Sequence, residues 1–184
     1  MKRVAVFLAE GFETCEALIV VDLLRRAQVR VDTISISNQL DVLSSQQVVV
    51  QADLTLKESI LSDYDVLFLP GGKLGTQNLE TCSSLLEAYQ NHFEQGKLCA
   101  AICAAPSILG HLGVLKGKNF TCFPGFEEDG FGGSYLGERV VLDGNVLTGL
   151  AMGASVDFGL KLVEILQGSD RLQLVKQGIQ YPEK

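Results

Sequence analysis

The stretch from Lys97 to Gly110 (KLCAAICAAPSILG) constrains the fold more than any other part of the sequence. An uncharged apolar run ends at Cys103, and small residues and a proline then lead into a second apolar segment. This order is typical of a buried strand that turns sharply into a helix, because proline is accepted in the first helical turn. At such an elbow the neighbouring residues must be small, since the strand and helix backbones nearly touch. The sequence therefore predicts a strand–elbow–helix unit centred on Cys103.

The elbow makes Cys103 a candidate nucleophile. Backbone N–H groups and the positive end of a helix dipole would surround its sulfur and favour the thiolate, so we expect a thiol pKa below the ordinary value of about 8.5. The alternative is that it acts as a small hydrophobic residue, as most free cysteines do. We expect that role for Cys99, which lies within the same apolar run.

Composition excludes several classes of protein. The 184 residues are 47% hydrophobic and 20% charged, which predicts one soluble domain over residues 1–184 with a substantial core. A net charge of −7 without a Lys/Arg cluster argues against nucleic-acid binding. No apolar run has the length of a membrane span. Glu10 and Glu13 interrupt the apolar start too early for a signal peptide, so a cytoplasmic protein is expected.

The cysteines indicate reduced thiols. There are five, at positions 15, 82, 99, 103 and 122, and neither they nor the two histidines show metal-ligand spacing. An odd number of cysteines without such spacing favours neither a disulfide scaffold nor a zinc site. We therefore expect no metal.

The order of elements predicts a parallel sheet. Apolar strands over 3–9 and 29–35 flank a helix over 17–27, which implies a right-handed parallel crossover. Asp143-Gly144-Asn145 predicts a late hairpin turn. The fold class expected is a flavodoxin-like doubly wound α/β sandwich, with a mostly parallel sheet and a late antiparallel hairpin.

Further expectations concern the remaining segments. A hairpin is expected within 38–51, strands over 65–69 and 117–123, and a loop over 126–137. Helices are expected over 54–61, 78–95, 155–166 and 170–177. Gly168 should separate the helices over 155–166 and 170–177, and His92 should lie on the surface of the helix over 78–95.

The topology brings three segments to one crevice. In doubly wound sheets, the loops after the carboxyl ends of the strands converge, here residues 10–16, residues 71–75 and Cys103. A carboxyl from the first would face the thiol. Glycines directly after a strand allow the backbone to approach a ligand, although an ordinary turn is an alternative. An N–H from the second segment and that of Ala104 would then hold an oxyanion.

These motifs resemble the ThiJ/PfpI superfamily, within it the ThiJ-like branch that contains the parkinsonism-associated deglycase. The resemblance covers nearly the whole chain and is carried by residues 8–16 (LAEGFETCE), 21–26 (VDLLRR), 64–72 (YDVLFLPGG) and 100–106 (AAICAAP).

The resemblance implies roles for individual residues. Cys103 would be the nucleophile and Glu16 its carboxyl partner, while Gly72 and Ala104 would donate to an oxyanion; Glu13, Gly71 and Phe123 would line the pocket. Members of the family are cytoplasmic homodimers without a metal or an organic cofactor. A homodimer also agrees with the first helix, which is apolar on more than one face and needs a second cover.

The thiol and the carboxyl would share a proton. A thiolate and a carboxylate in contact repel each other, so Glu16 should hold a proton and act first as general acid and then as base. The alternative role for Glu16 is that of a carboxylate at a helix start, stabilised by the helix dipole.

Departures from the family pattern limit the possible activities. Ala104 stands where PfpI-type proteases carry histidine, so peptidase activity by a Cys–His pair is not expected. Phe123 stands where some relatives have a pocket histidine, which predicts slow turnover. The family's Ser-Arg is here Ser45-Gln46, and its Gly-Pro-Gly-Thr is here residues 151–154 (AMGA).

Two functions follow as hypotheses. The first is a cofactor-free enzyme acting on small aldehydes or dicarbonyls, a glyoxalase that converts methylglyoxal to lactate and possibly a deglycase. The second is a redox-responsive stress sensor or chaperone in which Cys103 is oxidised to sulfinic acid.

Overall fold

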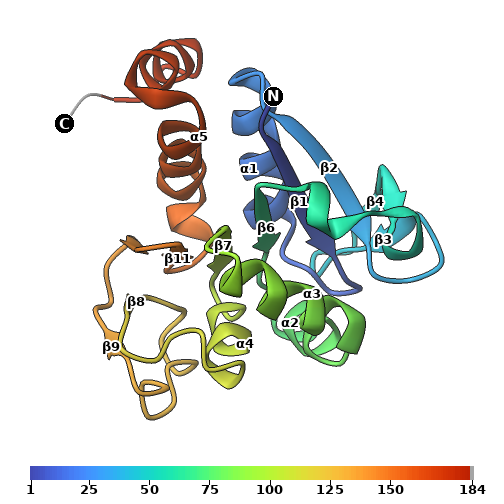
Figure 1. Cartoon of the computed structure of the whole chain (residues 1–184). Helices are drawn as coiled ribbons and strands as arrows, with labels where there is room; N and C mark the ends of the chain where they lie inside the picture. The colour runs from blue at the N-terminus through green and yellow to red at the C-terminus, as the bar shows by residue number, and fades with distance from the viewer. Residues whose placement is uncertain (183–184) are drawn as a thin grey trace.

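A seven-stranded sheet forms the middle layer of the computed structural model, which describes residues 1–182 (Figure 1). All neighbouring strands are parallel except β10, which pairs antiparallel with β11. The fold class is the one predicted. In spatial order the strands are β10 (Val140–Asp143), β11 (Val146–Gly149), β7 (Leu98–Ile102), β6 (Val66–Leu69), β1 (Arg3–Leu8), β2 (Arg30–Ser35) and β5 (Leu54–Thr55).

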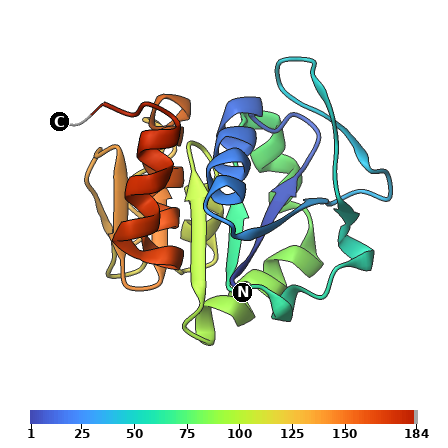
Figure 2. The same cartoon turned by 90° about the horizontal axis from the view of Figure 1, so that it is seen from above.

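Helices cover both faces of the sheet (Figure 2). One face carries α1 (Thr14–Arg26) and α5 (Ser155–Gly178), and the other carries α2 (Lys73–Glu80), α3 (Ser83–Glu94) and α4 (Pro106–His111). Strand β1 is apolar from Val4 to Leu8 because both of its faces are buried. Its alternate residues enter two separate cores, Val4 and Val6 on the α1 side and Ala5 and Phe7 on the α3 side. A parallel strand buried on both faces needs no polar alternation.

The last helix bends where the sequence predicts an interruption. Residues 155–178 are continuous helix except at Gly168, which has φ 81°. Glycine adopts this left-handed conformation without the penalty that a Cβ brings. The predicted hairpins also form: β3 (Asp41–Leu43) pairs with β4 (Val49–Gln51), and β10 pairs with β11.

The prediction of one helix over 78–95 is wrong in its bounds, and the prediction that His92 lies on its surface is wrong as well. The segment belongs to two helices, α2 and α3, that are separated at Thr81 and Cys82. His92 is buried, with 3% of its surface exposed, and its Nε2 lies 3.3 Å from the carbonyl oxygen of Asp65. Burial lowers the pKa of His92 to about 4. The ring is thus neutral near pH 7, and a backbone partner makes its burial tolerable.

Two other expected elements differ. In place of the helix expected over 54–61, the chain forms the short strand β5 and the 3₁₀ turn η1 (Leu56–Glu58), and a second 3₁₀ turn, η2 (Leu61–Asp63), begins at Leu61. The strand expected over 117–123 shrinks to β8 (Asn119–Phe120), which pairs with β9 (Ser134–Tyr135) outside the main sheet. The reason is topological, because β11 occupies the place beside β7 and β10 forms the edge.

Within residues 1–182, no helix combines the length and the apolar composition that a membrane crossing requires.

Candidate active site

Cys103 forms a strained elbow at the carboxyl end of β7. Its φ is 64°, a left-handed conformation that is costly for a residue with a side chain. Hydrogen bonds on both sides hold it there: its N–H donates to the Gly149 carbonyl over 2.9 Å, and its carbonyl accepts from the Phe123 N–H over 2.7 Å. Ala104 and Ala105 are buried beside it, and Pro106 begins α4. The predicted strand–elbow–helix unit is confirmed.

Gly71 lets the thiol and the Glu16 carboxyl approach each other. Its N–H donates to Glu16 Oε2 over 2.8 Å. A Cβ at this position would lie 2.6 Å from the Cys103 Cβ and 2.6 Å from Glu16 Oε2, and both distances are shorter than the van der Waals contacts of a Cβ atom. Glycine is therefore required here by a close approach of three segments.

The loops after β1 and β6 interlock through their backbones. Gly72 has φ 89°, and a Cβ on it would lie 2.4 Å from the Gly11 carbonyl oxygen. The Glu13 N–H donates to the Gly71 carbonyl over 2.9 Å, and the Gly75 N–H donates to Gly11 over 3.1 Å. The convergence expected from topology is thus present, with Cys103 between these loops.

Glu13 starts α1 and positions Glu16. Its side-chain Oε2 accepts the Glu16 N–H over 2.6 Å, which is an N-cap contact. The helix consequently begins with Glu16 in its first turn, and Glu16 is completely buried. The N-cap thus fixes the first turn of α1, from which the Glu16 carboxyl reaches the Gly71 N–H.

The Glu16 carboxyl is poised to carry a proton. Within residues 1–182, its buried Oε1 has no hydrogen-bond partner, and Cys103 and Glu13 are the side chains that shift its pKa. Burial, opposed by the Cys103 contact and helped by the charge of Glu13, raises the pKa of Glu16 to about 7. A carboxyl with this pKa exchanges a proton readily at neutral pH.

The electrostatics of the thiol differ from the expectation of a low pKa. Burial and then the charge and hydrogen bond of Glu16 raise the pKa of Cys103 to about 12, although the N–H groups of Gly72 and Ala104 lower it. The two groups therefore retain at least one proton between them near pH 7, and when one remains, either group can carry it. When Glu16 carries that proton, its charge no longer opposes the thiolate, and the two N–H groups then favour it.

Two further features of the site have no local signal in the sequence. Gly149, which holds the Cys103 N–H, is recognised only once β11 is placed beside β7. The second is an aromatic pair: Phe123, whose surface is 45% exposed, lies with its ring centroid 6.3 Å from that of Phe126 in an edge-on arrangement. The loop expected over 126–137 supplies this second ring.

The other thiols lie apart from this arrangement. Cys99 and Cys122 are buried, Cys15 is exposed and Cys82 is half-buried. Burial raises the pKa of Cys99 to about 12, so its predicted role as a core residue agrees with its place in β7. In the part of the chain that the structure describes, no group of three His, Cys, Asp or Glu side chains is placed to hold a metal ion.

The fold and the site together define an α/β protein with a cysteine elbow and a carboxyl partner. The family model described as DJ-1/PfpI matches residues 2–165, and the chain belongs to this family.

The chain is similar to several relatives and solved structures over most of its length. A Danio rerio "Parkinson disease protein 7 homolog" is 36% identical over 179 residues, 95% of either chain. The Schizosaccharomyces pombe "Glutathione-independent glyoxalase DJ-1" is 26% identical and covers 99% of this chain and 100% of its own. The crystal structure of Drosophila melanogaster DJ-1beta has a TM-score of 0.93, with 34% identity and 99% of each chain covered. The chain spans only 40% and 45% of two Arabidopsis thaliana DJ-1 homologues, to which it is 35% identical.

Proposed function

We propose that the protein is a cofactor-free cysteine enzyme acting on reactive dicarbonyls, which converts methylglyoxal to lactate through Cys103 and Glu16. The observation that carries the proposal is the contact of a strained thiol with a buried carboxyl whose pKa is about 7, beside two backbone N–H donors. The name of the fission yeast relative, a glutathione-independent glyoxalase, supports the same chemistry. Deglycase activity on early glycation adducts would use the same thiolate.

The first step is attack of the sulfur on the aldehyde carbon. With the proton on Glu16, the Cys103 thiolate forms a C–S bond and the carbonyl electron pair moves to oxygen. The N–H groups of Gly72 and Ala104, which already hydrogen-bond the sulfur, are available to that oxygen. An oxyanion donor is worth about 3–4 kcal/mol in related enzymes. Glu16 then gives its proton to the oxygen, which completes a hemithioacetal.

The second step moves a proton between carbons. The ionised Glu16 takes the proton from the first carbon, which leaves an enediolate. Glu16 returns this proton to the second carbon, while the hydroxyl proton on the oxygen of the first carbon passes to the oxygen of the second. The product is a thioester of lactate with Cys103. Water cleaves the C–S bond, releases lactate and restores the thiol. Methylglyoxal and water are the only reactants, so the sequence balances.

Lactate formation by the purified protein tests this proposal. Cys103→Ser should be inactive, and Glu16→Gln should lose about 10²–10⁴-fold in kcat, since it keeps the shape but not the proton. Cys15→Ser is the matched control, because this exposed thiol lies one residue from Glu16 and has no part in the scheme. Lactate formation by Cys103→Ser at the wild-type rate would exclude the mechanism. If the wild-type protein makes no lactate while peroxide oxidises Cys103 to sulfinic acid, the redox-sensor function is favoured.

We also propose a homodimer through α1. Helix α5 already covers part of the second apolar face of α1, where a Cβ on Gly159 would lie 2.6 Å from Leu23 Cδ1. A groove of about 560 Å³ remains along the rest of that face, between α1 and the end of the chain, lined by Leu18, Ile19, Val156 and Ile179 among others. Light scattering should give twice the mass of the 19.9 kDa chain. The monomer mass at micromolar concentration would refute this.

A further inference from the structure

We propose that the Cys103 site selects uncharged carbonyl compounds with an apolar substituent and rejects anionic ones, and that Phe123 sets the apolar part of this preference. The inference rests on the proposed function, since it names the substrate class of the same thiol. Two sets of observations carry it, one on charge and one on the surface beside the nucleophile.

The charge around the thiol is negative. The Glu16 carboxyl and the Cys103 Cβ both lie 2.6 Å from the position of a Cβ on Gly71, and the Glu13 carboxylate accepts the Glu16 N–H over 2.6 Å. These carboxylates are also the charged side chains that shift the pKa of the pair. The residue next to Ser45 is the neutral Gln46, and the Ser45 N–H donates to the Phe12 carbonyl in the site loop. An incoming carboxylate or phosphate would therefore meet like charge, which opposes binding.

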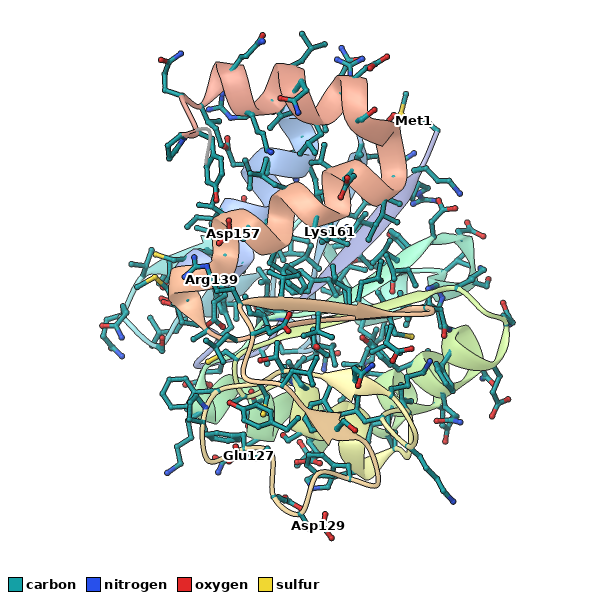
Figure 3. The ribbon with its side chains drawn as sticks, turned by 90° about the vertical axis from the view of Figure 1, so that its left-hand side faces the viewer. Met1, Glu127, Asp129, Arg139, Asp157 and Lys161 are labelled. Carbon is teal, nitrogen blue, oxygen red and sulfur yellow. The ribbon has the colours of Figure 1, made fainter. Side chains whose placement is uncertain are left out.

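Two cationic side chains on segments that adjoin the site, Arg139 and Lys73, do not offset this charge. Arg139 binds Asp157 at the start of α5, and the two side chains lie together there (Figure 3). The same guanidinium donates to the Gly153 carbonyl. Lys73 begins α2 directly after Gly72, but it is exposed and is not among the causes that shift the pKa of Glu16 or Cys103.

Exposed apolar side chains come from both segments that hold the Cys103 backbone. Phe123 donates its N–H to the Cys103 carbonyl, and 45% of the residue's surface is exposed. Met152, three residues after Gly149, which accepts the Cys103 N–H, is 50% exposed. Large apolar side chains tied by neighbouring backbone to a nucleophile provide surface for a substrate's alkyl or aryl group. Phe126 supports the Phe123 ring from the side.

Alkylation of Cys103 tests the charge selection without turnover. Iodoacetamide and iodoacetate each form a C–S bond and release iodide, and they differ in charge alone at the reacting end. We expect the ratio of their rate constants, amide over acid, to be at least about tenfold larger at Cys103 than at 2-mercaptoethanol in the same buffer, because roughly 1.4 kcal/mol of repulsion suffices for that factor. Glu13→Gln keeps an oxygen for the helix cap and should lower the ratio. A ratio equal to that of the free thiol would overturn the charge selection.

Substitution of Phe123 tests the apolar selection. Phe123→Ala should lower the kcat/KM of phenylglyoxal relative to that of methylglyoxal by about tenfold, and the rate of Cys103 alkylation by phenacyl bromide relative to iodoacetamide by a similar factor. Phe123→Leu retains apolar surface, so both of its ratios should lie between those of the wild-type protein and those of Phe123→Ala. Leu142→Ala removes an equally exposed apolar side chain on β10 and should change neither ratio. Unchanged ratios in Phe123→Ala and in Phe123→Leu would overturn the assignment. If no dicarbonyl is turned over at all, the proposed function fails, whereas the alkylation ratios still decide the selectivity.

Discussion

The two sides of the Cys103 crevice are held by different kinds of interaction. On one side, the loops after β1 and β6 interlock through backbone hydrogen bonds and close glycine contacts. A Cβ on Gly72 would lie only 2.4 Å from the Gly11 carbonyl oxygen. On the other side, side chains attach residues 123–137: His111 at the end of α4 pairs with Glu80 through Nδ1 and with Glu128 through Nε2 over 2.9 Å. The loops around Cys103 and Glu16 are thus fixed by packing and backbone hydrogen bonds, whereas the attachment of residues 123–137 depends in part on the ionisation of His111.

The attached loop has its own apolar anchor. The Phe131 ring packs so closely on α4 that a Cβ on Gly110 would lie 2.3 Å from its Cγ, and it meets the His111 ring edge-on at 5.3 Å. The acidic residues Glu127 and Asp129 of the same loop lie on the opposite side of the sheet from α5 (Figure 3). Loss of the His111 pairs would therefore loosen the loop without detaching it.

The largest effect expected on the packed side is that of Gly71→Ala. The new methyl group would collide with both Cys103 and Glu16, so the thiol and the carboxyl must separate. We expect kcat/KM for methylglyoxal to fall by at least about 10²-fold, as misplacement by 1 Å does elsewhere.

A matched substitution separates this collision from a general effect of adding a methyl group. Gly178→Ala lies in α5, where a Cβ would meet nothing within 4 Å, and it should leave kcat/KM unchanged. A Gly71→Ala protein that keeps wild-type activity, with circular dichroism showing an intact fold, would break the comparison between the two sides.

The next effect concerns stability and Glu16. Burial raises its pKa from 4.5 to about 7 in the folded protein, so the folded state binds the proton more tightly than the unfolded state. The resulting stabilisation is complete below pH 4.5 and is lost as the pH rises through 7; it amounts to roughly 3 kcal/mol. Glu16→Gln should remove this dependence and, relative to wild type, gain unfolding free energy between pH 5 and pH 8.

Urea unfolding at several pH values measures this difference. Glu164→Gln is the control, because its carboxylate is partly exposed and, among the described residues, pairs with Lys161, so its curve should run parallel to wild type. A constant difference between wild type and Glu16→Gln across this range would show that Glu16 ionises normally in the folded protein.

Most of the fold follows from patterns that are local in the sequence. The elbow at Cys103, the hairpin at Gly144 and the break at Gly168 each depend on a few neighbouring residues whose conformational limits are known. The convergence of the loops bearing Glu16 and Gly71 follows equally, because it requires only the parallel strand order.

What the sequence could not show depends on contacts between distant segments. His92 is polar, and its burial becomes understandable only when Asp65 is placed beside α3. The strand expected after Gly117 leaves the sheet because β11 occupies the available edge. The pKa of Cys103 likewise depends on the state of Glu16, a balance between burial and backbone donors that no local pattern reports.

The smallest effect belongs to the ionisable side of the crevice. Burial opposes a charge on His111, but the hydrogen bonds and charges of Glu80 and Glu128 outweigh it and raise the pKa of the ring. The stabilisation from these pairs is therefore complete below the unfolded pKa of 6.5 and is lost as the pH rises through the higher folded value. Because the groups are partly exposed, the pairs contribute less than about 1 kcal/mol.

Amide hydrogen exchange of residues 124–137, corrected for intrinsic rates, should thus accelerate by up to about fivefold between pH 6 and pH 9, while β6 in the core should not respond. His111→Gln should exchange at the fast rate at both pH values, since it keeps a polar side chain but cannot be charged. Equal protection of the loop at pH 6 and pH 9 in the wild-type protein would mean that Phe131 alone holds it, and that both sides of the crevice are fixed by packing.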